Sequence, residues 1–136
     1  MKTPLILLAE DSDDDAFFFE RVFKKSDVSC SLHRVVNGVE AVEFLRNASK
    51  TGDLPHTIFL DLKMPLLNGF DVLDWMRTQT FAVPIQVIVL SGSEHEDDKQ
   101  RAVKLGAADY LVKPIRVSHL HRIFEHVCPP QMGVPS

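Results

Sequence analysis

Thr57-Ile58-Phe59-Leu60-Asp61-Leu62 is a short apolar run that carries a single carboxylate near its end. Continuous apolar runs of this length are typical of strands that are buried on both faces of a parallel sheet. Asp61 is therefore expected at the carboxyl end of a buried strand, where an unpaired carboxylate costs several kcal/mol. That cost predicts partners for Asp61 and a functional reason for keeping it there.

Similar runs recur on both sides of this one, each followed by a stretch with helical periodicity. The predicted strands are Leu5–Ala9, Cys30–Val36, Thr57–Leu60, Ile85–Leu90 and Tyr110–Val112, and the predicted helices are Asp13–Lys25, Val39–Ser49, Gly69–Thr78, His95–Leu105 and Ser118–Val127. Ser93-x-x-Glu96 predicts a capping box that opens the fourth helix, and Gly106 is placed to close it. Five such units predict an α/β fold: a flavodoxin-like (βα)5 three-layer sandwich with a parallel sheet in the order 2-1-3-4-5.

Composition and charge narrow the class of protein. The 136 residues include 15 Lys and Arg against 19 Asp and Glu, a net charge of −4 without a basic cluster, which disfavours nucleic-acid binding. Neither a membrane-spanning run nor a signal peptide is recognisable, so a cytoplasmic location is expected. Cys30 and Cys128 form neither a disulfide framework nor a zinc pattern. One domain is predicted at residues 1–128, with a flexible tail rich in Pro and Gly at residues 129–136.

Polar side chains follow four of the predicted strands at the point where each strand ends. They are Glu10 and Asp11, Asp61, Ser91, and Lys113. In the predicted order the first and third strands are neighbours, so the three carboxylates should converge at the crevice where such sheets bind ligands. They repel one another unless a cation is present, and hard oxygen ligands suit Mg2+. With a hydroxyl and an ammonium group opposite, the set predicts phosphoryl transfer to Asp61 as nucleophile.

Four sequence blocks carry a resemblance to a known family. They are Leu7-Leu8-Ala9-Glu10-Asp11, Phe59-Leu60-Asp61-Leu62-Lys63-Met64-Pro65 with Asn68-Gly69, Val89-Leu90-Ser91-Gly92, and Tyr110-Leu111-Val112-Lys113-Pro114. In order and spacing the chain resembles response-regulator receiver domains of two-component systems, from about Leu5 to Val127. It is also similar to small stand-alone bacterial regulators, including those paired with bacterial phytochromes.

The resemblance implies a role for each matching residue. Glu10, Asp11, Asp61 and the backbone carbonyl of Lys63 would hold Mg2+, or Mn2+ in its place. Asp61 would accept a phosphoryl group from a sensor histidine kinase or a phosphotransfer protein, and the phosphoryl oxygens would bind Ser91 and Lys113. Ser91 and Tyr110 would act as the switch that alters the surface for a downstream protein.

Further expectations concern the fifth strand and the first helix. The Lys113–Pro114 peptide bond is predicted to be cis, because the chain must turn sharply while Lys113 points back to Asp61. The face built from the fourth helix, fifth strand and fifth helix is expected to carry the signal to a partner or to a second copy in a homodimer. Asp13, Asp14 and Asp15 are interpreted as residues that favour the start of the first helix. Phe17 is expected on its polar face, where a partner could contact it.

Three other classes of protein are weighed against this interpretation. A phosphohydrolase of the haloacid-dehalogenase type would carry Asp-x-Asp-x-Thr at the end of the first strand, whereas here Asp61 ends the third predicted strand, Lys63 stands two residues after it, and no cap domain fits. A flavodoxin-like nucleotide binder would need a phosphate-binding loop where Glu10 and Asp11 stand. A receiver-like protein that is never phosphorylated would not need the complete acidic set and Lys113. We therefore expect a module that catalyses its own phosphorylation and dephosphorylation, and not an enzyme acting on an outside substrate.

Overall fold

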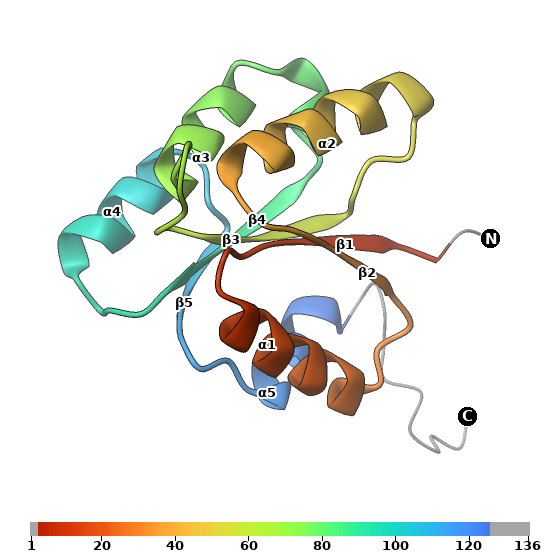
Figure 1. Ribbon diagram of the computed structural model, residues 1–136, viewed down its shortest axis with the longest axis vertical. Coiled ribbons are helices and arrows are strands. Elements are labelled where there is room, and N and C mark those ends of the chain that lie inside the picture. The colour runs from red at the N-terminus through yellow and green to blue at the C-terminus, as the bar shows by residue number, and fades with distance from the viewer. Residues whose placement is uncertain (1–2, 126–136) are drawn as a thin grey trace.

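The computed structural model describes residues 3–125, and these form a five-stranded parallel sheet between two layers of helices (Figure 1). The elements in chain order are β1 (Leu5–Ala9), α1 (Asp13–Ser26), β2 (Ser31–Val35), α2 (Gly38–Thr51), β3 (Thr57–Asp61), α3 (Gly69–Arg77), η1 (Thr80–Ala82), β4 (Gln86–Ser91), α4 (Glu96–Lys104), β5 (Asp109–Val112) and α5 (Val117–Phe124). The strand order is β2-β1-β3-β4-β5, which confirms the predicted fold and topology.

Two apolar cores lie on the two faces of the sheet. Alternate residues of each strand point to opposite faces, so Phe59 packs against α1 and α5, whereas Ile58 and Leu60 face α2 and α3. Figure 1 shows α1 and α5 below the sheet and α2, α3 and α4 above it. All five residues of β3 are buried, which is why its sequence shows no polar alternation. The central strand therefore places Asp61 at its buried carboxyl end.

The structure corrects the predicted start of the fourth helix. α4 begins at Glu96 with His95 as its N-cap, and no side chain caps it. Ser93 does not form the predicted capping box, because its N–H donates to Ser91 Oγ and its carbonyl accepts from the Tyr110 hydroxyl. The end of the helix is as predicted: Gly106 has a φ of +102°, and its N–H donates to the carbonyl of Val103.

Smaller differences concern the ends of elements and one cysteine. β2 is shorter than predicted, and β3 and β4 extend to Asp61 and Ser91, so these two polar residues belong to the strands themselves. Cys30 is disulfide-bonded, which the cysteine spacing did not predict, and Cys128 lies outside the described residues. The predicted tail at residues 129–136 and the predicted end of the last helix at Val127 also lie outside them.

Candidate phosphoryl-acceptor site

Three carboxylates meet at the carboxyl ends of β1 and β3. One carboxylate oxygen from each of Glu10, Asp11 and Asp61 lies within 4.8 Å of the other two. These three oxygens could together bind a metal ion. The convergence follows from the pairing of β1 with β3, in which Ala9 lies opposite Leu60. Glu10 and Asp61 are buried, whereas Asp11 is exposed to solvent. The site thus has a rigid buried part and one open side.

Arg34 of β2 and the start of α1 fix the loop that carries the acid pair. The Glu10 N–H donates to the carbonyl of Val35, and Arg34 Nε donates to the carbonyl of Glu10 at 3.0 Å. The Arg34 guanidinium also pairs with Asp13 at 2.9 Å. The N–H of Ser12 donates to the Glu10 carboxylate at 3.2 Å. Sequence reasoning did not single out Arg34, because a lone Arg on an edge strand has no distinctive pattern.

The α3 side of the site depends on a close approach of backbone to backbone. The N–H of Gly69, the first residue of α3, donates to the carbonyl of Leu62. A Cβ at Gly69 would lie 2.6 Å from the Asp61 carbonyl oxygen, so only glycine fits without displacement. On the way to α3, Lys63 is exposed and its N–H lies 3.4 Å from Asp61 Oδ1.

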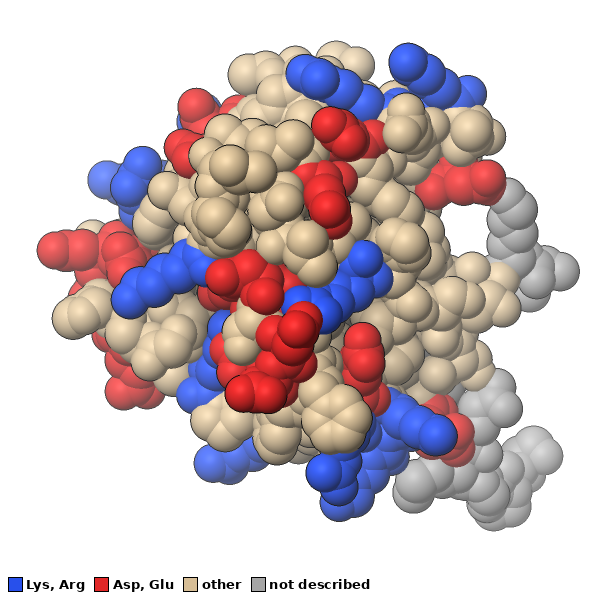
Figure 2. All heavy atoms as spheres, in the orientation of Figure 1, with Lys and Arg blue, Asp and Glu red and all other residues tan. Residues whose placement is uncertain are grey.

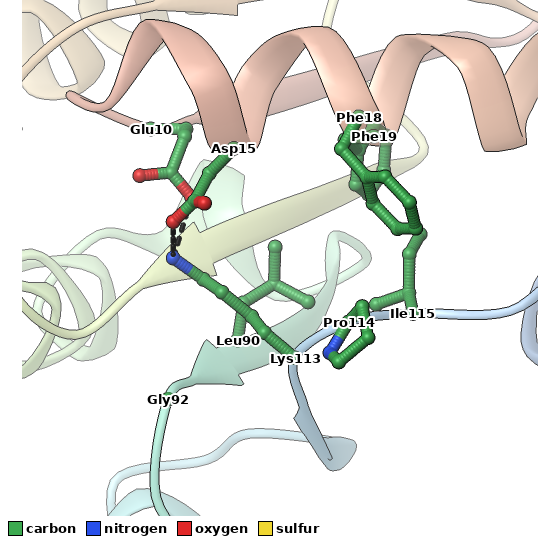
Figure 3. Close-up of a pocket in the computed structure, with 9 residues that line it drawn as sticks. All are labelled: Glu10, Asp15, Phe18, Phe19, Leu90, Gly92, Lys113, Pro114 and Ile115. Carbon is green, nitrogen blue, oxygen red and sulfur yellow. Dashed lines mark hydrogen bonds and ion pairs between the residues drawn. The ribbon is translucent and has the colours of Figure 1, made fainter.

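Lys113 reaches the acidic cluster from the end of β5. Its ammonium nitrogen lies 2.7 Å from Glu10, 2.9 Å from Asp15 and 3.4 Å from Asp61. Figure 3 shows this side chain crossing from β5 toward α1. The Lys113–Pro114 peptide bond, predicted to be cis, is cis. The contact with Asp15 was not predicted, because a carboxylate in the first turn of a helix is equally accounted for by the helix dipole.

The charges of the cluster are not balanced by Lys113 alone. Burial raises the pKa of Asp61 to about 7, the nearby Glu10 carboxylate adds to the shift, and Lys113 and the Lys63 N–H act in the opposite direction. Burial alone would lower the pKa of Lys113, but its hydrogen bonds to Glu10 and Asp15 outweigh burial and raise it. One ammonium group therefore does not neutralise the set, and a hard divalent cation with oxygen preference fits it.

The two residues predicted to form the switch are joined through the loop between β4 and α4. Ser91 and Tyr110 are both buried, and Leu90 of β4 lies opposite Leu111 of β5 in the sheet. Ser91 Oγ accepts from the N–H of Ser93 at 3.1 Å, and the Tyr110 hydroxyl donates to the Ser93 carbonyl at 3.0 Å. Ser93 is thus bonded to both side chains, a link that spacing alone did not reveal.

Beside Lys113 lies a cavity of about 440 Å³ (Figure 3). Glu10, Asp15 and Lys113 form its polar end, and its apolar side includes Phe18 and Ile115. On the face drawn in Figure 2, acidic side chains of the described residues gather near the centre with basic side chains beside them, and no continuous basic area is visible. Phe17 is exposed, as expected, and so is Phe18.

Comparisons with known proteins agree with this geometry. The sequence profile of the response regulator receiver domain matches residues 6–125. A probable methanogenesis regulatory protein, FilR2 of Methanothrix harundinacea, is 31% identical over 124 residues, which cover 90% of this chain and 80% of that protein. The chain spans less of several other curated relatives, transcriptional regulatory proteins of which it covers 48% in one case and 47% in two.

Two solved structures are similar over most of the chain. The bacteriophytochrome response regulator RtBRR superposes with a TM-score of 0.81 at 29% identity, over 91% of this chain and 77% of that one. The Mn2+-bound form of the response regulator Rcp1 superposes with a TM-score of 0.76 at 28% identity, over 98% and 99% of the two chains.

Proposed function

The chain belongs to the response regulator receiver domain family, and on this premise we propose that it is a phospho-acceptor module whose acceptor is Asp61. The phosphoryl group would come from the phosphohistidine of a sensor histidine kinase or of a phosphotransfer protein. The observation that carries the proposal is the position of Asp61: it is buried at the end of the central strand, with two further carboxylates within 4.8 Å and Lys113 at 3.4 Å.

The proposed reaction needs little covalent chemistry from the protein. A carboxylate oxygen of Asp61 attacks phosphorus, the bond from phosphorus to the imidazole nitrogen breaks, and that nitrogen keeps the electron pair and takes up a proton. Water later attacks phosphorus and releases inorganic phosphate and the free carboxylate. Lys113 and the Ser91 hydroxyl would bind the phosphoryl oxygens on which negative charge is spread.

Mg2+, or Mn2+ in its place, is the proposed cofactor. Glu10, Asp11, Asp61 and the carbonyl of Lys63 would hold it, and when bound it would neutralise charge between the carboxylates and the incoming phosphoryl group. The donor set supports this assignment because it consists of oxygens alone, and because burial and the Glu10 carboxylate raise the pKa of Asp61 despite Lys113, so that a divalent cation would stabilise its charged form. That a similar protein, Rcp1, has a Mn2+-bound form also supports it.

The biological role follows from the same proposal. The module acts in signalling and not on an outside substrate, and phosphorylation would change its α4–β5–α5 face for a downstream protein or for a second copy. A bacteriophytochrome-type kinase is our first choice of phosphodonor, because similar structures are named as bacteriophytochrome regulators. A cytoplasmic location and a bacterial origin fit such a partner. None of the helices within residues 3–125 is both long and apolar enough to cross a membrane.

Labelling by a small phosphodonor tests the proposal. With acetyl phosphate and Mg2+, intact-mass analysis should show one added phosphoryl group on the wild type, and none with excess chelator. Asp61→Asn should remain unlabelled, because the amide is not a nucleophile here. Asp74→Asn is the matched control, since Asp74 is an exposed carboxylate of α3, and it should be labelled like wild type. Labelling of Asp61→Asn at the wild-type level would refute the assignment.

A further inference from the structure

We propose that Asp15 is a positioning residue of this site: it holds the Lys113 ammonium group in the resting protein and gives it up when a phosphoryl group arrives on Asp61. The inference rests on the proposed function of Asp61 and adds a control on its rate. Asp15 belongs to the first turn of α1, and Lys113 directly follows β5, so their contact ties the start of α1 to the end of β5.

The Lys113 ammonium group lies among three carboxylates, two of which are close enough to accept a hydrogen bond from it. The nitrogen lies 2.7 Å from Glu10, 2.9 Å from Asp15 and 3.4 Å from Asp61. An ammonium group donates three hydrogen bonds and accepts none. Two of its donors are held by Glu10 and Asp15, whereas Asp61, at the longest of the three distances, is an ion-pair partner without a hydrogen bond. To move toward a phosphoryl oxygen on Asp61, the ammonium group has to lengthen at least one of its two short contacts.

The Asp15 side chain does not cap α1. The N-cap of α1 is Ser12, whose hydroxyl oxygen accepts from the Asp15 N–H at 3.2 Å. The Asp15 side chain turns instead toward the cavity, where Figure 3 draws it bonded to Lys113. Its neighbour Asp14 is exposed, and its side chain has no hydrogen bond or ion pair within the described chain. Of the two carboxylates, only Asp15 thus has a defined contact with the site.

Exposure decides which partner withdraws. The Asp15 side chain is 48% exposed, whereas that of Glu10 is 2% exposed and that of Asp61 is 7% exposed. Water can replace Lys113 at the exposed Asp15, whereas a buried carboxylate that loses an ion pair is not rehydrated and pays a larger desolvation penalty. Phosphorylation adds roughly 1.5 to 2 negative charges at Asp61. The ammonium group therefore shifts toward the phosphoryl oxygens at the expense of Asp15.

Asp15 then acts as a competitor of the phosphoryl group for Lys113. Removing its charge while keeping its shape should free Lys113 and lower the barrier to phosphoryl transfer. We expect Asp15→Asn to be labelled by acetyl phosphate about five-fold faster than Asp14→Asn, the scale of one exposed ion pair. Because both variants lose one charge from the same helix turn, their difference excludes a general effect of net charge. Mg2+ affinity should be equal in the two variants.

A double-mutant cycle with Lys113→Met separates this role from a structural one. Initial labelling rates and affinity for beryllofluoride, a phosphoryl mimic, are measured with saturating Mg2+ in both backgrounds. Asp15→Asn should bind beryllofluoride more tightly than Asp14→Asn when Lys113 is present, and the two should bind equally in the Lys113→Met background. Beryllofluoride binding keeps the cycle measurable if Lys113→Met is labelled too slowly.

The outcomes distinguish this inference from the proposed function. Equal rates and equal beryllofluoride affinities for Asp15→Asn and Asp14→Asn, with a labelled wild type, overturn the role of Asp15 alone. The same acceleration in the Lys113→Met background also overturns it, because the effect would then not act through the ammonium group. A wild type that is not labelled with Mg2+ present removes both proposals.

Discussion

At the scale of the residue, Asp61 is a carboxylate that the fold holds at a cost to stability. Its pKa is raised from an ordinary 3.8 to about 7, first by burial and then by Glu10. A group whose pKa is higher in the folded state stabilises the fold fully below its unfolded pKa of about 4, and this contribution is lost as the pH rises through about 7. The contribution of Asp61 should therefore make the metal-free protein less stable above pH 7 than at pH 4 to 5.

Asp61→Asn removes this titration and should stabilise the cation-free protein at high pH. The rise in pKa corresponds to about 4 kcal/mol as an upper limit, so we expect the variant to exceed wild type by roughly 2–4 kcal/mol at pH 8 and by much less near pH 4.5. Urea unfolding with a chelator measures it. Saturating Mg2+ should reduce the difference, and Asp74→Asn, which loses an exposed carboxylate, should show none. A difference that does not depend on pH would contradict this account.

At the scale of the element, the position of α3 relative to β3 depends on Gly69. A Cβ there would meet the Asp61 carbonyl oxygen at 2.6 Å and the Leu62 Cα at 2.9 Å, both of them backbone atoms that cannot rotate away. Gly69→Ala should therefore push the start of α3 away from the site and destabilise the fold by about 1–3 kcal/mol, as overpacking does.

The matched control for this substitution is Gly92→Ala, since an added Cβ at Gly92 meets nothing within 4 Å. Its free energy of unfolding should stay close to that of the wild type. Thermal or urea unfolding compares the two variants, and labelling by acetyl phosphate shows whether the displaced loop also impairs Asp61. If the two substitutions cost the same, the close approach of α3 to β3 is not what requires glycine at position 69.

Also at this scale, the sequence was more informative about strands than about helix starts. Each buried strand of this parallel sheet is a short apolar run, so the runs around Ile6, Phe59 and Ile88 were recognisable without further context. The start of α4 was not, because Ser93 satisfies the local capping pattern but bonds instead to Ser91 in the preceding strand and to Tyr110, which lies 17 residues away on β5. Long-range contacts that replace a local one leave no trace in local spacing.

At the scale of the whole molecule, the strand order allowed most of the candidate site to be predicted from the sequence. Once β1 and β3 are neighbours, residues at their carboxyl ends must meet, and the structure brings Glu10, Asp11 and Asp61 together. The roles of Asp15 and Arg34 were not predicted, because their contacts depend on the orientation of a helix turn and of an edge strand. The positions of side chains at strand ends can be inferred from the strand order. Contacts made by side chains at the periphery of the site are revealed only by the three-dimensional structure.

Also at this scale, Asp61 is expected to influence the α4–β5–α5 face through the loop between β4 and α4. Ser93 is bonded on one side to Ser91 Oγ and on the other to the Tyr110 hydroxyl. If Ser91 turns toward a phosphoryl oxygen, it must weaken its bond to the Ser93 N–H, and the loop between β4 and α4 can then move relative to Tyr110. Two arrangements of this loop would form the two-state element that a switch needs.

Hydrogen exchange with and without beryllofluoride should therefore change not only in the loops around Asp61 but also in residues 92–104 and in β5. Tyr110→Phe removes the bond to the Ser93 carbonyl while keeping the ring, so the same segment should exchange faster already in the free protein and respond less to beryllofluoride. Ser91→Ala should also respond less, whereas Ser49→Ala, a substitution of the same kind on α2, should respond like wild type. Changes confined to the vicinity of Asp61, with wild-type responses in Ser91→Ala and Tyr110→Phe, would exclude this route, because the loop would then not depend on either hydroxyl.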